Sequence, residues 1–461
     1  MRGDLQGIFG MEIATYSPTA SSTAIRSVVA VTVQWRWSLN YGDVEAAYLH
    51  TKNKERTLII FPKGFGKVAE ALGWDDYSEG DGAMLLTYLY GMKQAGREWF
   101  FQVRGKLIGI GFECIPTEPC VMIRKIKGEI KEIILFYVDD FLHSSESDAV
   151  FLKFLKECKE NGINIEGLGR PKKFLGLYFE EMQKGWRLHL EPYIGEVLKK
   201  FKLEGLPAAH QPAPMSRLEQ EGEPLEEEHK KLYRPLIGVA LWIACVLRGP
   251  DIGFSVIQCA SFSENPTKTH WKALLRIFAY LKATANYSLE YVYTRDAEKL
   301  RIKSYVDASW AVTCYGGHIT FGMGGILDFK FSRIRSICKS SHEAEVLQAS
   351  RSATTTKGFS KLWEGIGVEA ILKEAGAKLY PITMLCDNEG AIATAGNELI
   401  TNRTKHIAIA DLYIKQAVQE AFIDIVKVGT KENLADLTTK PLSKQRIKEL
   451  VVSIYSPRGS D

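Results

Sequence analysis

The stretch Tyr137-Val138-Asp139-Asp140 decides how the rest of the chain is interpreted. It ends an apolar run, residues 133–138, that is short and rich in β-branched and aromatic residues, which predicts a buried strand. Successive side chains of a strand point to opposite faces, so both carboxylates serve one site only if the chain turns here. We therefore expect a hairpin, in which the two acids repel each other unless cations lie between them. Taken alone, the motif also fits a solvated turn between strands.

The length and composition are those of a soluble protein with several domains. The 461 residues are 46% hydrophobic and 25% charged, and predict two to four domains. We expect no membrane partner, because no apolar run reads as long enough to span a bilayer and the first residues do not begin a signal peptide. The net charge of +4 neither establishes nor excludes nucleic-acid binding. The eight cysteines form no Cys-x-x-Cys pair and are expected to be reduced thiols of an intracellular protein.

A further acid precedes this hairpin. Residues 39–42 form a predicted strand that ends in Asp43, and Tyr48 follows five residues later. A single Asp after a strand is commonly a cap or turn residue. Placed opposite Asp139, however, Asp43 would complete a metal site of three carboxylates.

A predicted helix starts after a glycine turn near residue 91 and continues to about residue 107. Its first turn carries three polar side chains: Lys93, Gln94 and Arg97. These groups either face a phosphate or a base edge of a nucleic acid or form a solvated helix face.

The C-terminal part has a different pattern. Residues 207–228 are rich in Pro and Glu and lack periodicity, which predicts a linker, and helical segments follow it. From residue 300 the predicted order of elements is βββαβαβα. Four acids lie at strand ends and on inward helix faces of this pattern: Asp307, Glu345, Asp387 and Asp436. Binding of divalent metal explains four carboxylates gathered in this way.

Together, these motifs resemble those of copia-type LTR retrotransposon Pol polyproteins. Residues that look like reverse transcriptase motifs, in the family's order and spacing, are 43–50, 90–94, Arg97, Trp99 and 137–140. Segments that resemble the connection between polymerase and nuclease are 233–238, 250–252, 270–271 and 280–284. Segments similar to the family's ribonuclease H are 340–345, 385–388, 403–407 and 433–442. The resemblance runs roughly from Tyr16 to Leu442, and the collinear set is more specific than any single motif.

The resemblance implies an α+β protein in three parts. Residues 1–185 would form a right-hand-like polymerase palm with the fingers largely missing, because the chain begins close to the motif before Asp43. Residues 186–298 would form the thumb or connection, with the linker near 207–228. Residues 299–461 would form an α/β ribonuclease H-like domain. The family's gag, protease and integrase parts are not in this chain.

For the polymerase, the resemblance implies that Asp43, Asp139 and Asp140 hold two Mg²⁺ ions, with Mn²⁺ as the alternative, for in-line phosphoryl transfer. Tyr48 matches the aromatic position that packs under the nucleotide sugar and excludes a 2′-hydroxyl, although a core tyrosine fits its spacing nearly as well. The family's nucleotide and template contacts fall on Gln94, and its backbone contacts on Lys93 and Arg97. The implied partners are an RNA template, a DNA primer and dNTPs.

For the nuclease, the resemblance implies that Asp307, Glu345, Asp387 and Asp436 bind two further Mg²⁺ ions and cut the RNA strand of an RNA–DNA hybrid. Glu345 is preferred over Glu343 because the family motif places the ligand second. The two positions lie roughly 200° apart on a helix, so only one of them faces the site. The implied location is the cytoplasm, within virus-like particles, with access to the nucleus.

Two departures from the family pattern affect the nuclease. Residues 314–320 replace the family's Arg-Ser-Thr-Ser-Gly run, and the interval from Asp307 to Glu345 is shortened, which predicts the loss of part of a hairpin. Residues 403–407 continue without the family's usual charge pattern. Three alternatives therefore stay open from the sequence: both activities are present, only the nuclease works, or the chain is an inactive remnant that at most binds nucleic acid.

Overall fold

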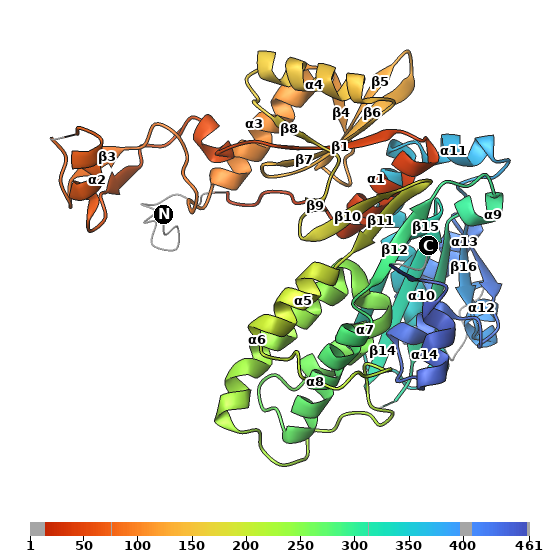
Figure 1. Ribbon diagram of the computed structural model, residues 1–461. Helices are drawn as coiled ribbons and strands as arrows, with labels where there is room; N and C mark the ends of the chain where they lie inside the picture. Colours follow the sequence, from red (N-terminus) through yellow and green to blue (C-terminus); the bar gives the residue numbers. More distant parts are fainter. Residues whose placement is uncertain (1–13, 75, 312, 397–407, 459–461) are drawn as a thin grey trace. The chain divides into compact units, whose positions relative to one another are not determined.

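The structure is a computed structural model that describes residues 14–74, 76–311, 313–396 and 408–458 (Figure 1). The chain divides into two compact units. Of the described residues, the first unit contains 14–20, 40–114 and 119–169, and the second contains 21–39, 115–118 and 170–458. The predicted α+β class is confirmed, since each unit combines sheets with helices. The three-part domain division stays a prediction.

Six strands form the main sheet of the first unit, in the order β4-β5-β6-β7-β1-β8. Their bounds are β1 Ser38–Asp43, β4 Phe112–Cys114, β5 Val121–Ile126, β6 Glu129–Tyr137, β7 Asp140–Ser145 and β8 Glu166–Gly169. Strands β6 and β7 pair antiparallel from Glu132 with Ser145 to Tyr137 with Asp140. The hairpin expected at residues 137–140 is therefore present.

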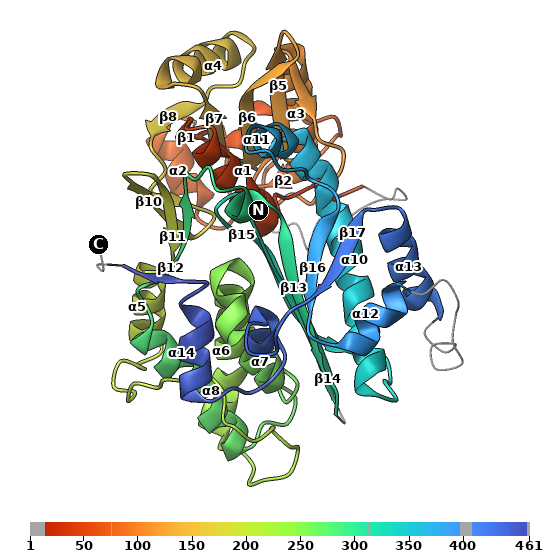
Figure 2. The same cartoon turned by 90° about the vertical axis from the view of Figure 1, so that its right-hand side faces the viewer.

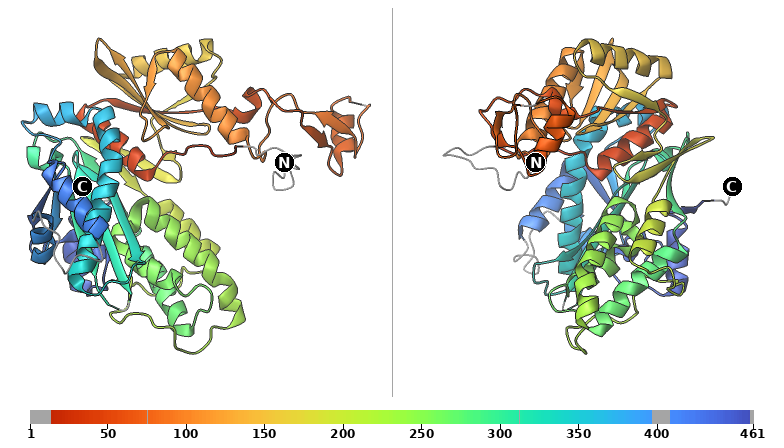
Figure 3. Two further views of the ribbon diagram at one scale, coloured as in Figure 1. Left: turned by 180° about the vertical axis from the view of Figure 1, so that it is seen from behind. Right: turned by 60° about the vertical axis from the view of Figure 1, so that its left-hand side comes forward.

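Two helices bury their apolar faces in the core of this unit: α3 (Ala95–Gly109) and α4 (Asp148–Glu160). Helix α3 contributes Trp99, Val103 and Leu107, which are four residues apart and so form one stripe. They meet apolar side chains of β5, β6 and β7. The ribbon of α3 lies against this sheet in Figures 1 and 3. A smaller sheet pairs β2 (Leu58–Ile60) with β3 (Gly82–Met84), near α2 (Phe65–Ala71) and after the 3-10 helix η2 (Ala47–His50).

The second unit begins with helix α1 (Ser22–Gln34) and contains a five-stranded sheet of order β18-β12-β11-β10-β9. These strands are β9 Lys173–Phe174, β10 Leu177–Met182, β11 Gly185–His189, β12 Tyr287–Val292 and β18 Ser456–Pro457. Four α-helices and one π-helix lie between β11 and β12: α5 Glu191–Lys200, α6 Glu227–Ile243, η3 Ala244–Arg248, α7 Gly249–Ala260 and α8 Lys268–Ala283. The predicted linker, residues 207–228, contains no helix or strand before α6.

The continuous helical stretch Glu227–Ala260 corrects one expectation from the sequence. By length and composition it is apolar enough to cross a membrane, with 67% of its most apolar window buried inside the protein. A buried core helix of a folded domain has the same character, because both exclude water from an apolar surface. The sequence predicted separate helical segments here, 233–247 and 254–262, and not one continuous stretch. Between them lie Arg248 and Asp251, which pair with each other at 2.5 Å.

The second sheet of this unit, called the β13–β17 sheet below, has the order β15-β14-β13-β16-β17. Strands β13 (Lys303–Ser309), β14 (Cys314–Gly322) and β15 (Gly325–Ile334) are antiparallel, whereas β16 (Ile382–Cys386) and β17 (Ile423–Lys427) run parallel to β13. Helix α10 (Ser341–Gly365) and helix α7 lie on opposite sides of this sheet (Figure 2). The remaining elements are α9 Ala297–Leu300, α11 Val368–Glu374, α12 Glu389–Gly396, α13 Ala408–Gln419, η5 Leu434–Thr438 and α14 Lys444–Val451.

The predicted order βββαβαβα is thus present, with three corrections. The hairpin of β14 and β15 is complete, pairing from Cys314 with Ile334 to Gly322 with Gly325, so the shortened interval removes no strand. Asp307 lies inside β13 rather than at its end, because the ladder with β14 continues to Ser309. The segment around Asp436 is a 3-10 turn, and the last α-helix starts later, at Lys444.

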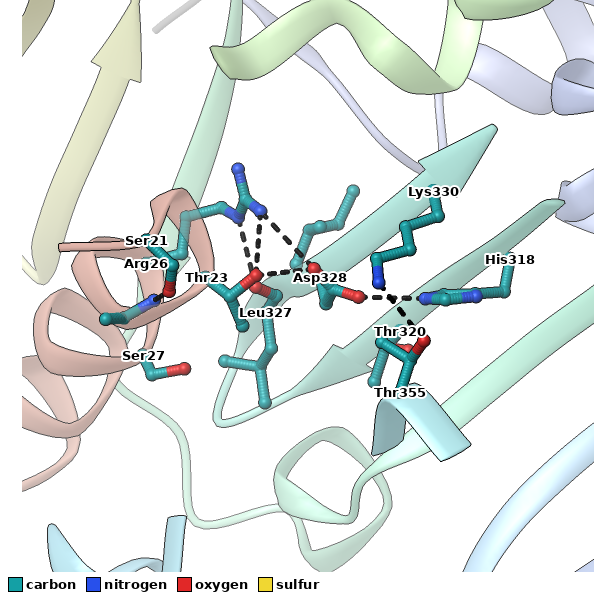
Figure 4. A network of polar contacts seen from close by, with 12 residues as sticks. Ser21, Thr23, Arg26, Ser27, His318, Thr320, Leu327, Asp328, Lys330 and Thr355 are labelled. Carbon is teal, nitrogen blue, oxygen red and sulfur yellow. Dashed lines mark hydrogen bonds and ion pairs between the residues drawn. The ribbon is translucent and has the colours of Figure 1, made fainter. Parts of the chain in front are cut away.

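A buried polar network fixes α1 to the β13–β17 sheet (Figure 4). The Thr23 hydroxyl donates to Asp328 of β15 at 2.5 Å, and the Arg26 guanidinium lies 3.7 Å from the same carboxylate. His318 contacts Asp328 through Nε2 at 2.8 Å and Ser352 through Nδ1 at 3.2 Å. A Ser, His and Asp in this order suggest a nucleophile and its base. Each is less than 5% exposed, however, so this network is structural.

Two candidate metal centres

The first candidate centre lies in the first unit, at the end of β1 and the turn between β6 and β7. Asp43 is the last residue of β1, and Asp140 is the first residue of β7. Val138 has a φ of +58°, an uncommon conformation for a β-branched residue. That conformation lets Tyr137 pair directly with Asp140 and leaves Val138 and Asp139 as a two-residue turn.

Hydrogen bonds hold this turn against its neighbours. The Trp99 indole N–H of helix α3 donates to the Val138 carbonyl at 2.6 Å. The backbone N–H of Val44 donates to the Asp139 carbonyl at 3.0 Å. Because Val44 directly follows Asp43, the second bond brings the end of β1 to the turn. The three acids predicted from the sequence therefore lie near one another, although their carboxylate oxygens are not gathered within 4.8 Å as those of the second centre are.

The electrostatics of this centre suit a cation. Burial first, and then the neighbouring acids Asp139 and Asp140, raise the pKa of Asp43. Burial also raises the pKa of Asp140, although the Tyr41 hydroxyl donates a hydrogen bond to this carboxylate and partly offsets the rise. Carboxylates that repel one another in this way are stabilised by a divalent ion that prefers hard oxygen ligands.

Tyr48 lies near this centre, in the 3-10 helix η2. Its ring stacks at a tilt on Tyr90, with the ring centroids 4.5 Å apart. Burial raises the pKa of Tyr48, and the charge of Asp139 adds to the effect. The structure therefore places Tyr48 next to the acids, with Tyr90, which belongs to the 90–94 motif but was given no role of its own, as a second aromatic residue.

The three polar residues predicted at the start of α3 differ in their surroundings. Gln94 is buried, and its side-chain amide donates to Glu55. Arg97 is partly exposed, lies 2.8 Å from Glu98 and stacks over the Phe101 ring. Lys93 is exposed. Gln94 thus has Glu55 as a protein partner. Lys93 is the most exposed of these three polar residues.

The second candidate centre lies in the second unit. In the described part of the chain, one group of three acidic, His or Cys side chains has ligand atoms that all lie within 4.8 Å of one another: Asp307, Glu345 and Asp387. Asp307 comes from β13, Glu345 from the first turns of α10, and Asp387 directly follows β16. Their grouping arises because β13 and β16 are adjacent parallel strands and α10 packs over β13.

Glu343, the other candidate on α10, is engaged elsewhere. Its carboxylate accepts a hydrogen bond from the Lys339 N–H at 2.6 Å, and its own N–H donates to Ser340, the N-cap of the helix, at 3.2 Å. Glu343 thus stabilises the start of α10. Glu345 remains the acid of this helix that lies in the cluster.

Asp436, the fourth predicted acid, lies in η5 beside the cluster. Its carboxylate pairs with Lys440 at 2.6 Å and lies 3.6 Å from Arg446 of α14. The Lys440 ammonium also lies 3.6 Å from Asp307. The chain itself therefore supplies cations on one side of this centre.

Two further residues support this centre and were not singled out from the sequence. The Thr439 hydroxyl donates a hydrogen bond to Asp307. The Asn433 side-chain amide donates to the Val306 carbonyl at 3.0 Å and to Asp387 at 3.4 Å. Their only sequence signal is their place within the run 433–440, next to Asp436.

Burial dominates the titration of the second centre. It raises the pKa of Glu345 to about 9, with the charges of Asp307 and Asp387 adding to the effect. It also raises the pKa of Asp307 to about 6, although Lys440 and Thr439 act in the opposite direction. One Glu345 oxygen, Oε2, is buried without a hydrogen-bond partner. An unpartnered carboxylate oxygen among other acids fits a divalent ion, which would supply the missing partner. Residues 403–407 lie outside the described residues.

Comparisons with known proteins cover both parts of the chain. Residues 8–215, which contain the first candidate centre, match the family model described as "Reverse transcriptase (RNA-dependent DNA polymerase)". Pol polyproteins of copia-type retrotransposons are similar to this chain over most of its length.

Similar proteins cover nearly the whole chain. Over 94% of its length the chain is 26% identical to the Retrovirus-related Pol polyprotein from transposon RE2 of Arabidopsis thaliana, and over 96% it is 28% identical to that from transposon RE1. The chain spans 29% of the length of each of these two relatives. A solved foamy viral protease-reverse transcriptase in complex with double-stranded DNA aligns with 93% of this chain and 61% of its own, at 13% identity and a TM-score of 0.48.

Proposed function

We propose that this chain is an RNA-directed DNA polymerase with an attached ribonuclease H. The observation that carries the proposal is the presence of two separate carboxylate centres, one in each unit. The first joins Asp43 to the turn of Asp139 and Asp140. The second gathers Asp307, Glu345 and Asp387. Two centres rich in carboxylates suit two reactions that both displace groups at phosphorus.

In the polymerase centre, Asp43, Asp139 and Asp140 would hold Mg²⁺, with Mn²⁺ as the alternative. The bound ions supply the charge that activates the primer 3′-hydroxyl and neutralises the leaving pyrophosphate. The chain's own residues fix the ligands: Trp99 and Val44 hold the turn, and Tyr41 orients Asp140 through its hydroxyl. The substrates would be an RNA template, a DNA primer and dNTPs.

Side chains beside this centre would select and orient the nucleotide. The Tyr48 ring, stacked on Tyr90, would pack under the sugar and exclude a 2′-hydroxyl. Lys93 and Arg97 would contact phosphates, because both carry charge near the start of α3. Gln94 would reach the nucleotide or template only after leaving Glu55.

In the nuclease centre, Asp307, Glu345, Asp387 and Asp436 would hold the ions. Ions held by these acids would supply positive charge for the attacking water and the scissile phosphate. Thr439 and Asn433 hold two of the carboxylates in place from the side of η5. The substrate would be the RNA strand of an RNA–DNA hybrid, recognised by its 2′-hydroxyls.

The test is a paired assay on one labelled RNA template with a DNA primer in Mg²⁺, scored for primer extension and RNA cleavage together. We expect both products, with extension lost in Asp139→Asn and cleavage lost in Asp387→Asn. Cleavage without extension would reduce the proposal to a nuclease on an inactive polymerase scaffold. If a folded wild-type chain yields neither product, the acid motifs reflect only the evolutionary origin of the chain, and the proposal is wrong.

A further inference from the structure

The position of Lys440 divides the nuclease centre into two unequal halves. On one side, the oxygens of Asp307, Glu345 and Asp387 lie within 4.8 Å of one another. On the other side, the Lys440 ammonium lies 2.6 Å from Asp436 and 3.6 Å from Asp307. A cation of this chain therefore already bridges Asp307 and Asp436.

The local chain holds the ammonium in this position. The Thr439 hydroxyl donates a hydrogen bond to Asp307, and this bond holds Thr439 close to that carboxylate. The side chain of the next residue, Lys440, therefore starts beside Asp307. The Lys440 N–H donates to the Asp436 carbonyl at 3.3 Å, which completes the turn after η5. Arg446 approaches Asp436 from elsewhere, at 3.6 Å, and leaves Lys440 as the cation between the two acids.

The charges of the two halves differ accordingly. In the half with Glu345, the buried oxygen Glu345 Oε2 has no hydrogen-bond partner, and no lysine or arginine of the described residues forms an ion pair with Glu345 or Asp387, although the Lys440 charge acts on both acids. Asp436 Oδ1 also has no hydrogen-bond partner, but it lies 2.6 Å from the Lys440 ammonium. The half with Asp436 has its negative charge balanced by Lys440 and Arg446. A divalent ion gains more from the first half, since an ammonium at the second half repels any ion placed beside it.

We propose that Lys440 is a resident cation that occupies the place of the second divalent ion, so that without nucleic acid the centre binds one ion, at Asp307, Glu345 and Asp387. This inference rests on the proposed nuclease function. A second ion between Asp307 and Asp436 enters only after the ammonium leaves. The flexible four-carbon stem of lysine, one-third exposed here, permits that movement.

The alternative is that Lys440 only stabilises the fold through its ion pair with Asp436. The two roles differ in what the centre binds. A structural lysine affects melting temperature without changing how many ions bind. A resident cation limits the centre to one ion, and its removal admits a second ion close to the first, at about 3.5–4 Å as in two-metal sites.

The experiment is a titration of the full chain with Mn²⁺ alone, without nucleic acid. Its two readouts are the number of ions bound and the low-temperature EPR spectrum. Two Mn²⁺ ions in one site give a spin-coupled signal that a single ion does not give. All variants carry Asp139→Asn, so that ions at the polymerase centre contribute less. The ions at the nuclease centre are those lost on Asp387→Asn.

For the wild-type nuclease centre we expect one ion and an uncoupled signal. Lys440→Met is expected to bind a second ion, at least about tenfold more tightly than the chain with Lys440 does, and to give the coupled signal. Lys440→Gln serves as a second neutral variant if Lys440→Met does not fold. Lys431→Met, which removes a charge from an exposed lysine of the same segment, is expected to behave as the wild type.

A coupled pair in the chain with Lys440, bound as tightly as in Lys440→Met, would overturn the inference and leave the nuclease proposal standing. If Asp387→Asn loses no Mn²⁺, the nuclease centre itself is wrong, and the inference falls with it.

Discussion

The two carboxylate centres differ in how the chain holds its acids. In the polymerase centre, Asp43, Asp139 and Asp140 are all partly exposed and lie on a strand end and a tight turn. In the nuclease centre, Asp307 is 1% exposed and Glu345 is 6% exposed. Backbone amides, an indole and one tyrosine hydroxyl position the first set, whereas a lysine, an arginine, a threonine and an asparagine surround the second.

This difference has an energetic consequence. Buried carboxylates without a full set of partners favour the protonated form or a bound cation, because desolvation penalises the charge. The nuclease centre therefore stores more electrostatic strain in the metal-free chain than the polymerase centre, whose acids reach solvent. Metal binding should stabilise the two centres unequally, and the following predictions test that contrast.

Neutralising one acid in each centre should give the largest effects. Glu345→Gln and Asp139→Asn should each lower their own reaction by about 1,000-fold or more, the scale of losing one member of a catalytic group. Only Glu345→Gln should also stabilise the metal-free chain at neutral pH, by about 1–3 kcal/mol, because the wild-type carboxylate must take up a proton when it is buried on folding and glutamine need not. Paired activity assays and chemical denaturation in chelator check both expectations. If Asp139→Asn stabilised the metal-free chain by the same amount, the two centres would not differ in electrostatic strain, and the prediction would be wrong.

The pH dependence of stability should reflect the same buried acid. The pKa of Glu345 is raised from 4.5 to about 9 in the folded chain, so its protonated form favours folding. Its contribution is fully present below the unfolded pKa and is lost as pH rises through the folded pKa. In chelator, we expect the free energy of unfolding to fall by about 2–3 kcal/mol between roughly pH 5 and 9, less than the full shift implies.

Denaturation curves across this pH range measure the effect, and Glu345→Gln is the control in which most of the slope should disappear. Asp307, with a pKa raised to about 6, acts in the same direction at the acidic end. Stability that rises with pH in chelator, or a slope unchanged in the variant, would contradict the assignment of strain to Glu345.

Local sequence patterns predicted much of the fold and both sets of acids. The apolar run before Asp139 and the adjacent acids predicted the hairpin, because strand and turn preferences act over a few residues. The extent of β13 was not predictable in this way. Its partner β14 pairs up to Ser309, so a tertiary ladder, not local sequence, places Asp307 inside the strand.

The supporting residues of the sites were harder to predict than the acids. Thr439 and Asp307 are 132 positions apart, and their contact exists only once η5 packs beside β13. The same holds for Trp99, whose indole reaches Val138 across 39 positions. A Thr, Lys or Trp in a sequence has many ordinary uses, so only the folded arrangement separates these from core or surface residues.

Removing one hydroxyl from each centre should sharpen the comparison at an intermediate scale. Thr439→Val removes the donor to buried Asp307, and Tyr41→Phe removes the donor to the more exposed Asp140. A buried hydrogen bond to a charge contributes about 1.5–3 kcal/mol, so cleavage should fall about tenfold or more in Thr439→Val. Extension in Tyr41→Phe should fall less. Steady-state rates of both reactions in both variants test the order, and the reverse order would contradict the role of burial.

The smallest effect should come from the turn itself. Trp99→Phe keeps the aromatic ring in the core of α3 but loses the indole hydrogen bond to the Val138 carbonyl. A single neutral hydrogen bond contributes about 1 kcal/mol, so extension should fall roughly fivefold while cleavage stays unchanged. Phe100→Leu, a neighbouring core change without that bond, separates loss of packing from loss of turn geometry. If both variants reduce extension equally, the indole bond does not position Asp139, and the turn is held by the Val44 amide and the strands alone.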